Sequence, residues 1–233
     1  MEINAKEFLL PLGIATPMGG ARYSVDQFVG SSFFINGEGW VATCKHNLSE
    51  LSAGQHYTCH YLRDGTIHEL TDIRCHPKAD LAIGRIDVRG EYLTPHADRL
   101  LPGIDVCAMG LVKRGIHDGL LAIDFRYLKG YVTRVGPNDF DFPTGPTLLE
   151  VSFPSLPGFS GAPLITDTNQ LLGMLYGNLE STIEAFSMKE VSRAGELYRE
   201  TVHRVLELGL AHPLEQFTQW VEELGAWLGE SAT

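Results

Sequence analysis

The chain has 233 residues, enough for one large domain or two small lobes but not for a many-domain assembly. Its 18 Lys and Arg against 29 Asp and Glu give a net charge of −11, which argues against binding nucleic acid or anionic lipid through the overall field. A hydrophobic fraction of 44% excludes wholesale disorder. No segment approaches the roughly 20 apolar residues that span a membrane, and the first residues lack the pattern of a secretion signal. We therefore expect a cytoplasmic protein with neither a membrane nor a nucleic-acid partner.

Short β-strands between turns are predicted for most of the chain, up to about residue 186. The apolar runs are bounded by Gly, Pro, Asn or Asp, which favours β structure over helix. A connector at residues 90–102 separates two groups of strands, so we expect lobes at residues 1–96 and 97–187. The first group covers residues 29–35, 40–44, 57–62, 66–73 and 81–86, and the second covers residues 105–109, 120–128, 131–135, 147–153, 162–165 and 171–176.

A change of pattern after Met188 predicts a C-terminal helical extension over residues 188–233. Apolar residues recur there at helical spacing in two stripes, separated by His212-Pro213. The stripes consist of Val191, Ala194, Tyr198, Val202, Val205 and Leu206, and then of Leu214, Phe217, Trp220, Val221, Leu224 and Leu228. We favour packing of both helices on the β body. The alternative is that the aromatic residues Phe217, Trp220 and Trp227 dock a partner chain.

The four cysteines form no CxxC pair, so buried free thiols are the simplest interpretation. They are Cys44, Cys59, Cys75 and Cys107. The dipeptides Cys59-His60 and Cys75-His76, with His56 nearby, leave a zinc site as the alternative, but zinc ligands usually show tighter paired spacing. We expect no metal and no cofactor.

Three short segments carry residues that can perform chemistry together. His46 follows the apolar run 41–44, Asp80 precedes the apolar run 81–83, and Ser160 lies in the segment Pro-Gly-Phe-Ser-Gly-Ala-Pro-Leu at 157–164. A serine hydroxyl is a weak nucleophile near neutral pH and needs a base such as imidazole within hydrogen-bond reach. A carboxylate then fixes the imidazole tautomer. Asp72 and Asp87 are rival candidates for that carboxylate.

The glycines on either side of Ser160 favour a tight turn rather than a generic loop. Gly158 and Gly161 permit backbone conformations that other residues rarely adopt. In such a turn several N–H groups converge on one point, where a developing oxyanion can be stabilised. The order His, Asp, Ser together with this turn points to acyl transfer by an activated serine.

At these residues the chain resembles the trypsin-like (chymotrypsin-fold) serine peptidases, and most of all their bacterial branch with HtrA-type and glutamyl-endopeptidase-like enzymes. Gly-Ser-Ser-Phe-Phe-Ile at 30–35 is similar to that branch's G-S-G-F-x-I strand, and Thr-Cys-Lys-His at 43–46 to its T-A-x-H element. Asp-Leu-Ala-Ile at 80–83 matches D-L-A-[VI], and 157–164 matches P-G-x-S-G-x-P-L. The likeness spans roughly residues 8–186.

The resemblance implies two six-stranded antiparallel β-barrels with the site between them. It makes Ser160 the nucleophile, His46 the general base and then acid, and Asp80 the orienting carboxylate. It places the oxyanion hole at the backbone N–H groups of Gly158 and Ser160. An extended peptide substrate would pair with the backbone edge at Tyr176, Gly177 and Asn178. The predicted activity is that of a serine endopeptidase.

The chain departs from the family pattern at positions that bear on substrate preference. The residue six positions before the nucleophile is Pro154 rather than Asp, so we expect a small or apolar residue before the scissile bond instead of Lys or Arg. An α/β-hydrolase esterase is disfavoured because Ala162 stands where G-x-S-x-G requires glycine. A catalytically inactive peptide-binding module of the same fold is the alternative of another class. The helical extension is a candidate site for a regulatory protein.

Overall fold

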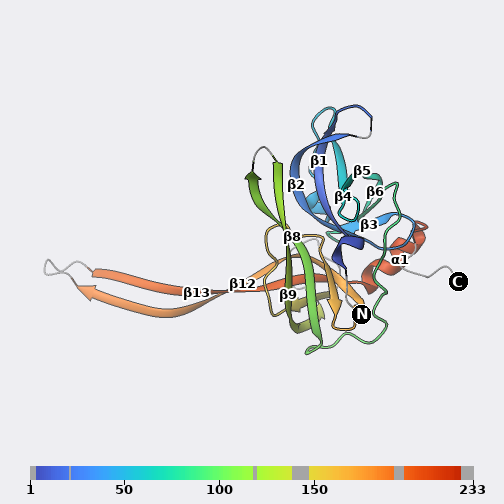
Figure 1. The fold of residues 1–233 in the computed structure, drawn as a ribbon. Helices are drawn as coiled ribbons and strands as arrows, with labels where there is room; N and C mark the ends of the chain where they lie inside the picture. Colours follow the sequence, from blue (N-terminus) through green and yellow to red (C-terminus); the bar gives the residue numbers. More distant parts are fainter. Residues whose placement is uncertain (1–3, 21, 118–119, 138–146, 192–196, 227–233) are drawn as a thin grey trace.

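A computed structural model describes residues 4–20, 22–117, 120–137, 147–191 and 197–226. The described chain forms two antiparallel β bodies, one from each half of the sequence, with one short α-helix near the C-terminus (Figure 1). This confirms the predicted mainly β, chymotrypsin-like fold. Within the described residues, no helix has the length and apolar character to cross a membrane.

The first body is a seven-stranded sheet whose two edge strands are consecutive in the chain. The strand order is β5-β4-β1-β2-β3-β7-β6, and only Leu70 separates β5 from β6. The sheet therefore curls until its edges meet at Leu70, and the predicted single strand over residues 66–73 is bent there into two. Its strands are β1 (Leu9–Pro17), β2 (Tyr23–Phe34), β3 (Trp40–Thr43), β4 (His56–Tyr61), β5 (Thr66–Glu69), β6 (Thr71–Cys75) and β7 (Ala82–Arg85).

The second body is a closed barrel of six strands in the order β10-β13-β12-β11-β8-β9. Its apolar interior includes Leu149, Phe159, Leu164 and Leu175, all of which are fully buried. Its strands are β8 (Asp105–His117), β9 (Leu120–Pro137), β10 (Thr147–Val151), β11 (Pro163–Thr166), β12 (Leu171–Val191) and β13 (Leu197–Pro213). The chain is completed by two 3₁₀ turns, η1 (Ala5–Glu7) and η2 (Lys45–Asn47), and by the helix α1 (Glu215–Glu223).

Local sequence explains the turn that leads to the site. The Asn36 side chain accepts hydrogen bonds from the N–H groups of Glu38 and Trp40, which closes the predicted turn between β2 and β3. Gly39 has a φ of 89°, and a Cβ there would lie 2.3 Å from the Ile86 carbonyl oxygen. Only glycine fits this position. The turn thus directs β3 toward η2, which carries His46.

The prediction of a helix from the first C-terminal stripe is wrong. The residues from Leu197 to Pro213 form β13, which pairs with β12 and belongs to the barrel. The predicted lobe boundary at residue 187 accordingly falls inside β12. Tyr198, Val202 and Leu206 are four residues apart, and that spacing keeps residues on one face of a strand as well as on one face of a helix. Ala194 lies outside the described residues.

The second stripe does form a helix, although a shorter one than predicted. Phe217 and Val221 on α1 are buried in the core, and Trp220 packs against it. Packing on the β body is therefore the correct interpretation for these residues, not docking of a partner chain. Trp227 and Leu228 lie outside the described residues.

Candidate active site

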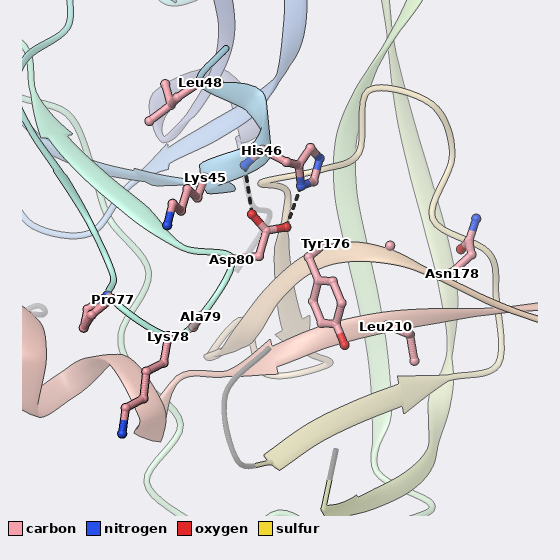
Figure 2. A pocket seen from close by; sticks show the side chains of 11 residues that line it. Lys45, His46, Leu48, Pro77, Lys78, Ala79, Asp80, Tyr176, Asn178 and Leu210 are labelled. Carbon is pink, nitrogen blue, oxygen red and sulfur yellow. Dashed lines mark hydrogen bonds and ion pairs between the residues drawn. The ribbon is translucent and has the colours of Figure 1, made fainter. Parts of the chain in front are cut away.

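His46 and Asp80 are joined by two hydrogen bonds (Figure 2). The backbone N–H of His46, in η2, donates to Asp80 Oδ1 over 2.8 Å, and the ring Nδ1 lies 2.5 Å from Oδ2. The rival carboxylates Asp72 and Asp87 are exposed on the first body. The structure therefore pairs His46 with Asp80 rather than with either rival.

The protonation state of Asp80 fixes the tautomer of His46. Burial acts to raise the Asp80 pKa, but the hydrogen bonds and charge of His46 outweigh it, so this pKa lies below its ordinary value. An ionised carboxylate can only accept hydrogen bonds, so Nδ1 must carry the proton. In the neutral ring with this tautomer, Nε2 has the lone pair that a general base needs.

Ser160 follows a tight turn that begins at Leu156. The Phe159 N–H donates to the Leu156 carbonyl over 2.8 Å, with Pro157 and Gly158 between them. Proline at the second position and a glycine with φ of 97° at the third are typical of a type II turn. A Cβ on Gly158 would lie 2.3 Å from the Leu111 carbonyl oxygen. Steric crowding and backbone conformation both require glycine here.

Buried polar residues of the first body hold this turn. Ser31 Oγ donates to the Gly158 carbonyl over 2.7 Å, and the Ser31 N–H donates to the Ser160 carbonyl over 2.9 Å. Asn47 Nδ2 donates to the same Ser160 carbonyl over 3.0 Å. Because Asn47 directly follows His46, this bond places the Ser160 backbone next to the segment that carries the histidine.

The Ser160 hydroxyl itself is not hydrogen-bonded to His46 among the residues that the structure describes. Catalytic hydrogen bonds are often long in the absence of substrate and tighten when it binds. The N–H groups of Gly158 and Ser160 likewise have no acceptor within the described part of the chain. These two donors are therefore available to another group.

A cavity of about 670 Å³ lies beside the His46–Asp80 pair. All three residues predicted to bind substrate line it, and Figure 2 shows Tyr176 between Asp80 and Leu210. Tyr176 is the extra residue of a β-bulge, since Leu175 pairs with Ala211 and Gly177 with Leu210. Bulges bend a strand and redirect side chains, and they are frequent next to active sites. The wall of the cavity consists of Lys45, His46, Leu48, Pro77, Lys78, Ala79, Asp80, Tyr176, Gly177, Asn178 and Leu210.

The Asn178 side chain connects this strand to the segment before the nucleophile. Its Nδ2 donates to the Ser155 carbonyl over 2.9 Å, and its Oδ1 accepts from the Ser155 N–H over 2.5 Å. Since these bonds occupy both ends of the amide, Asn178 can contribute its backbone to a bound peptide while its side chain holds Ser155 in place.

His212 lies buried behind the cavity. Its ring stacks on Tyr176 with 4.1 Å between the ring centroids and meets Phe217 of α1 edge-on. Neither ring nitrogen has a hydrogen-bond partner within the described residues. Burial lowers the His212 pKa from 6.5 to about 4, while the nearby Asp80 charge acts in the opposite direction. His212 is therefore neutral at neutral pH.

This neutral histidine predicts a loss of stability in acid. The unfolded chain binds a proton at His212 below pH 6.5, whereas the folded chain does so only near pH 4, so stability falls as the pH drops through that window. Between pH 6.5 and 5, chemical denaturation should show that the free energy of unfolding falls by about 1.6 kcal/mol more in the wild type than in His212→Phe. His203→Gln, which removes an exposed imidazole, should behave as the wild type. Equal losses of unfolding free energy in the wild type and His212→Phe would contradict the assignment of His212 as a neutral buried group.

The cysteines are free thiols, three of them buried as predicted and Cys75 exposed. The group around Cys59 and His60 does not form a metal cluster among the described residues. The side chains that do converge are Cys44, His46 and Asp80, whose ligand atoms lie within 4.8 Å of one another. Burial and the Asp80 charge raise the Cys44 pKa well above its ordinary value, so Cys44 is a neutral thiol. Its Sγ donates to the Leu175 carbonyl.

Sequence reasoning missed the residues that support the site. Ser31 and Asn47 hold the turn at Ser160, and His212 supports Tyr176 from behind. Asn47 opens an Asn-x-Ser glycosylation sequon, yet its side chain is buried against Gly30. In each case the partner is distant in sequence, so no local pattern signals the contact.

A family model described as a trypsin-like peptidase domain matches residues 30–174, which is more than half of the chain. No curated protein sequence matches this chain significantly.

Solved structures share the fold at low sequence identity. The HtrA-type protease AlgW with a tripeptide is 21% identical with a TM-score of 0.57, over 94% of this chain and 62% of AlgW. A protease from M. tuberculosis, Rv3671c in its active form, is 17% identical with a TM-score of 0.62, over 97% of this chain and 85% of that one. This chain therefore spans less than two thirds of the length of AlgW. The domain match over residues 30–174 and the shared two-body β fold establish that the chain belongs to the trypsin-like peptidase family.

Proposed function

We propose that this protein is a serine endopeptidase that cleaves peptide bonds through an acyl-enzyme intermediate, with Ser160, His46 and Asp80 as its catalytic triad. The observation that carries the proposal is the pair of hydrogen bonds between His46 and an ionised Asp80, next to a Ser160 turn that Asn47 holds. A bacterial, cytoplasmic setting stays a prediction from the sequence.

The reaction follows from the protonation states at the site. Ser160 Oγ attacks the peptide carbonyl carbon while its proton passes to the lone pair of His46 Nε2. Asp80 stabilises the imidazolium that forms. The imidazolium then gives its proton to the departing amine, the C–N bond breaks, and an ester to Ser160 remains. Water activated by His46 hydrolyses the ester and restores the enzyme.

The turn at Ser160 supports an oxyanion hole. The Gly158 and Ser160 N–H groups have no acceptor in the described structure, so they can bind the oxygen that becomes negative during attack. Ser31 Oγ binds the carbonyl of Gly158 and thereby helps to fix the orientation of the turn. The donors are therefore preorganised and need not be ordered by the substrate.

The cavity supports binding of an extended peptide along β12. Its wall is mainly apolar, which suits an aliphatic or aromatic side chain of the substrate, and Lys45 and Lys78 favour an acidic neighbour. Backbone at Tyr176, Gly177 and Asn178 can pair with the peptide by strand addition. AlgW, a protease of this fold, has been solved with a tripeptide. A small or apolar residue before the scissile bond stays a prediction.

An inactive peptide-binding module is the second candidate, because the Ser160 hydroxyl makes no hydrogen bond to His46 in the described structure. The tautomer of His46 and the unoccupied N–H donors favour the enzyme. A regulatory partner remains part of the proposal, but the aromatic residues of α1 are packed in the core. Exposed apolar residues lie on β12 and β13 instead.

A fluorophosphonate probe tests for an activated serine. Only an activated hydroxyl reacts rapidly with such a probe. We expect one adduct per chain, located on Ser160 by peptide mass spectrometry, and no adduct in His46→Ala. An unlabelled wild-type protein, or labelling that persists in His46→Ala, contradicts the proposal and favours the binding module.

A further inference from the structure

The strands β12 and β13 continue beyond the barrel as a two-stranded ribbon, which we call the arm (residues 180–191 and 197–207). Figure 1 shows the arm extending away from both β bodies. At about 3.3 Å per residue it reaches roughly 40 Å. An isolated two-stranded ribbon is at best marginally stable in water, so this element needs a surface to pack on.

The arm has one predominantly apolar face. Directly opposed residues of an antiparallel pair share a face, and successive residues alternate. Phe186 opposes Val202, and Ile183 opposes Arg204 on the same face. We call this face the apolar stripe. Its apolar members are Ile183, Phe186, Met188, Tyr198, Val202 and Leu206, and its polar members are Ser181, Glu190, Glu200 and Arg204. Phe186 is 54% exposed and Tyr198 is 58% exposed.

The opposite face is largely polar. Its described residues are Thr182, Glu184, Ser187, Lys189, Thr201 and His203, with Val205 nearer the barrel and the pair Val191 and Leu197 at the far end. Three acidic residues of the arm, Glu180, Glu184 and Glu207, also lie on this face. Two others, Glu190 and Glu200, pair with Tyr198 and Met188 and therefore lie on the face of the stripe, together with Arg204.

We propose that the apolar stripe is a homodimer interface, in which the arms of two copies of this chain pack face to face and antiparallel. A ribbon offers no groove, and the surface that best fits a twisted β face is another β face of equal twist. Two copies meet that condition by identity, as in the two-fold interfaces that most homo-oligomers use.

The stripe is complementary to itself. With the two-fold axis at Phe186 and Val202, Tyr198 of each copy lies over Leu206 of the other. Positions 200 and 204 are opposed in the same way, so Glu200 of each copy lies over Arg204 of the other, and their opposite charges attract. A strip about 40 Å long and about 15 Å wide buries roughly 1,200 Å² over both copies, which reaches the lower limit for a stable protein interface.

Sedimentation velocity over roughly a hundredfold range of concentration tests the proposal. The wild type should be a dimer that dissociates only at low concentration. Val202→Glu and Phe186→Glu should raise the dimer Kd about 100-fold or more, because each buries a charge in an apolar contact. Their matched controls are Thr201→Glu and Ser187→Glu, the neighbouring positions on the polar face, which should dimerise as the wild type does.

A variant with a shortened arm distinguishes loss of the interface from misfolding of the point variants. Glu180 and Glu207 are directly paired, so an Asn-Gly turn can replace residues 181–206 and close the ribbon there. This variant should be a folded monomer by circular dichroism and sedimentation. A wild-type protein that is monomeric at every concentration overturns the proposal, even if its arm binds a different protein. A trimer overturns it too, and so does a dimer that persists in Val202→Glu.

Discussion

We expect replacement of Ser160 by alanine to lower kcat for peptide hydrolysis by about 10⁶-fold, because it removes the hydroxyl that forms the proposed acyl-enzyme. The fold should be retained, since the contacts of this residue in the structure are made by its backbone carbonyl with Ser31 and Asn47. Equal melting temperatures of wild type and variant would verify this. Ser24→Ala, at an exposed position on β2, is the matched control and should keep full activity.

We expect replacement of Asp80 by asparagine to lower kcat by about 10⁴-fold with little change in KM. An amide can donate a hydrogen bond to Nδ1, which favours the tautomer that carries its proton on Nε2 and cannot act as base. Asp72→Asn and Asp87→Asn are the matched controls, since both carboxylates are exposed and neither is hydrogen-bonded to the His46 ring in the described structure. Steady-state kinetics on one peptide compare the three variants. A large loss in either control, or none in Asp80→Asn, removes Asp80 from the mechanism.

The two β bodies could be predicted because their signals are local. Turn residues bound each strand, and the glycines at 158 and 161 together with Pro157 reveal the turn before the nucleophile. Chain order and family resemblance then gave the His46–Asp80 pair, which the structure contains. The Ser160 hydroxyl is the part of the triad for which the structure shows no direct contact with His46 in the described residues.

The supporting contacts could not be predicted because they join distant parts of the chain. Ser31 reaches Gly158 across 127 positions, and nothing around Ser31 distinguishes it from Ser32. The bulge at Tyr176 depends on the register between β12 and β13, which no short segment encodes. His212 becomes a neutral buried group only because Tyr176 and Phe217 enclose it.

The arm was missed for a different reason. Apolar residues at spacings of four satisfy both the helical and the strand period, so Tyr198, Val202 and Leu206 gave no basis for choosing between them. These residues form a strand because they pair with β12. A helix would have needed a packing surface on the barrel, and the strand extends the existing β12 ladder instead.

Digestion of a proteome-derived peptide library by wild type beside Ser160→Ala tests the proposed activity most directly. We predict new peptide termini with the wild type only, enriched after small or apolar residues. Their absence with the wild type, or the same termini with Ser160→Ala, would contradict the assignment of this protein as a serine endopeptidase.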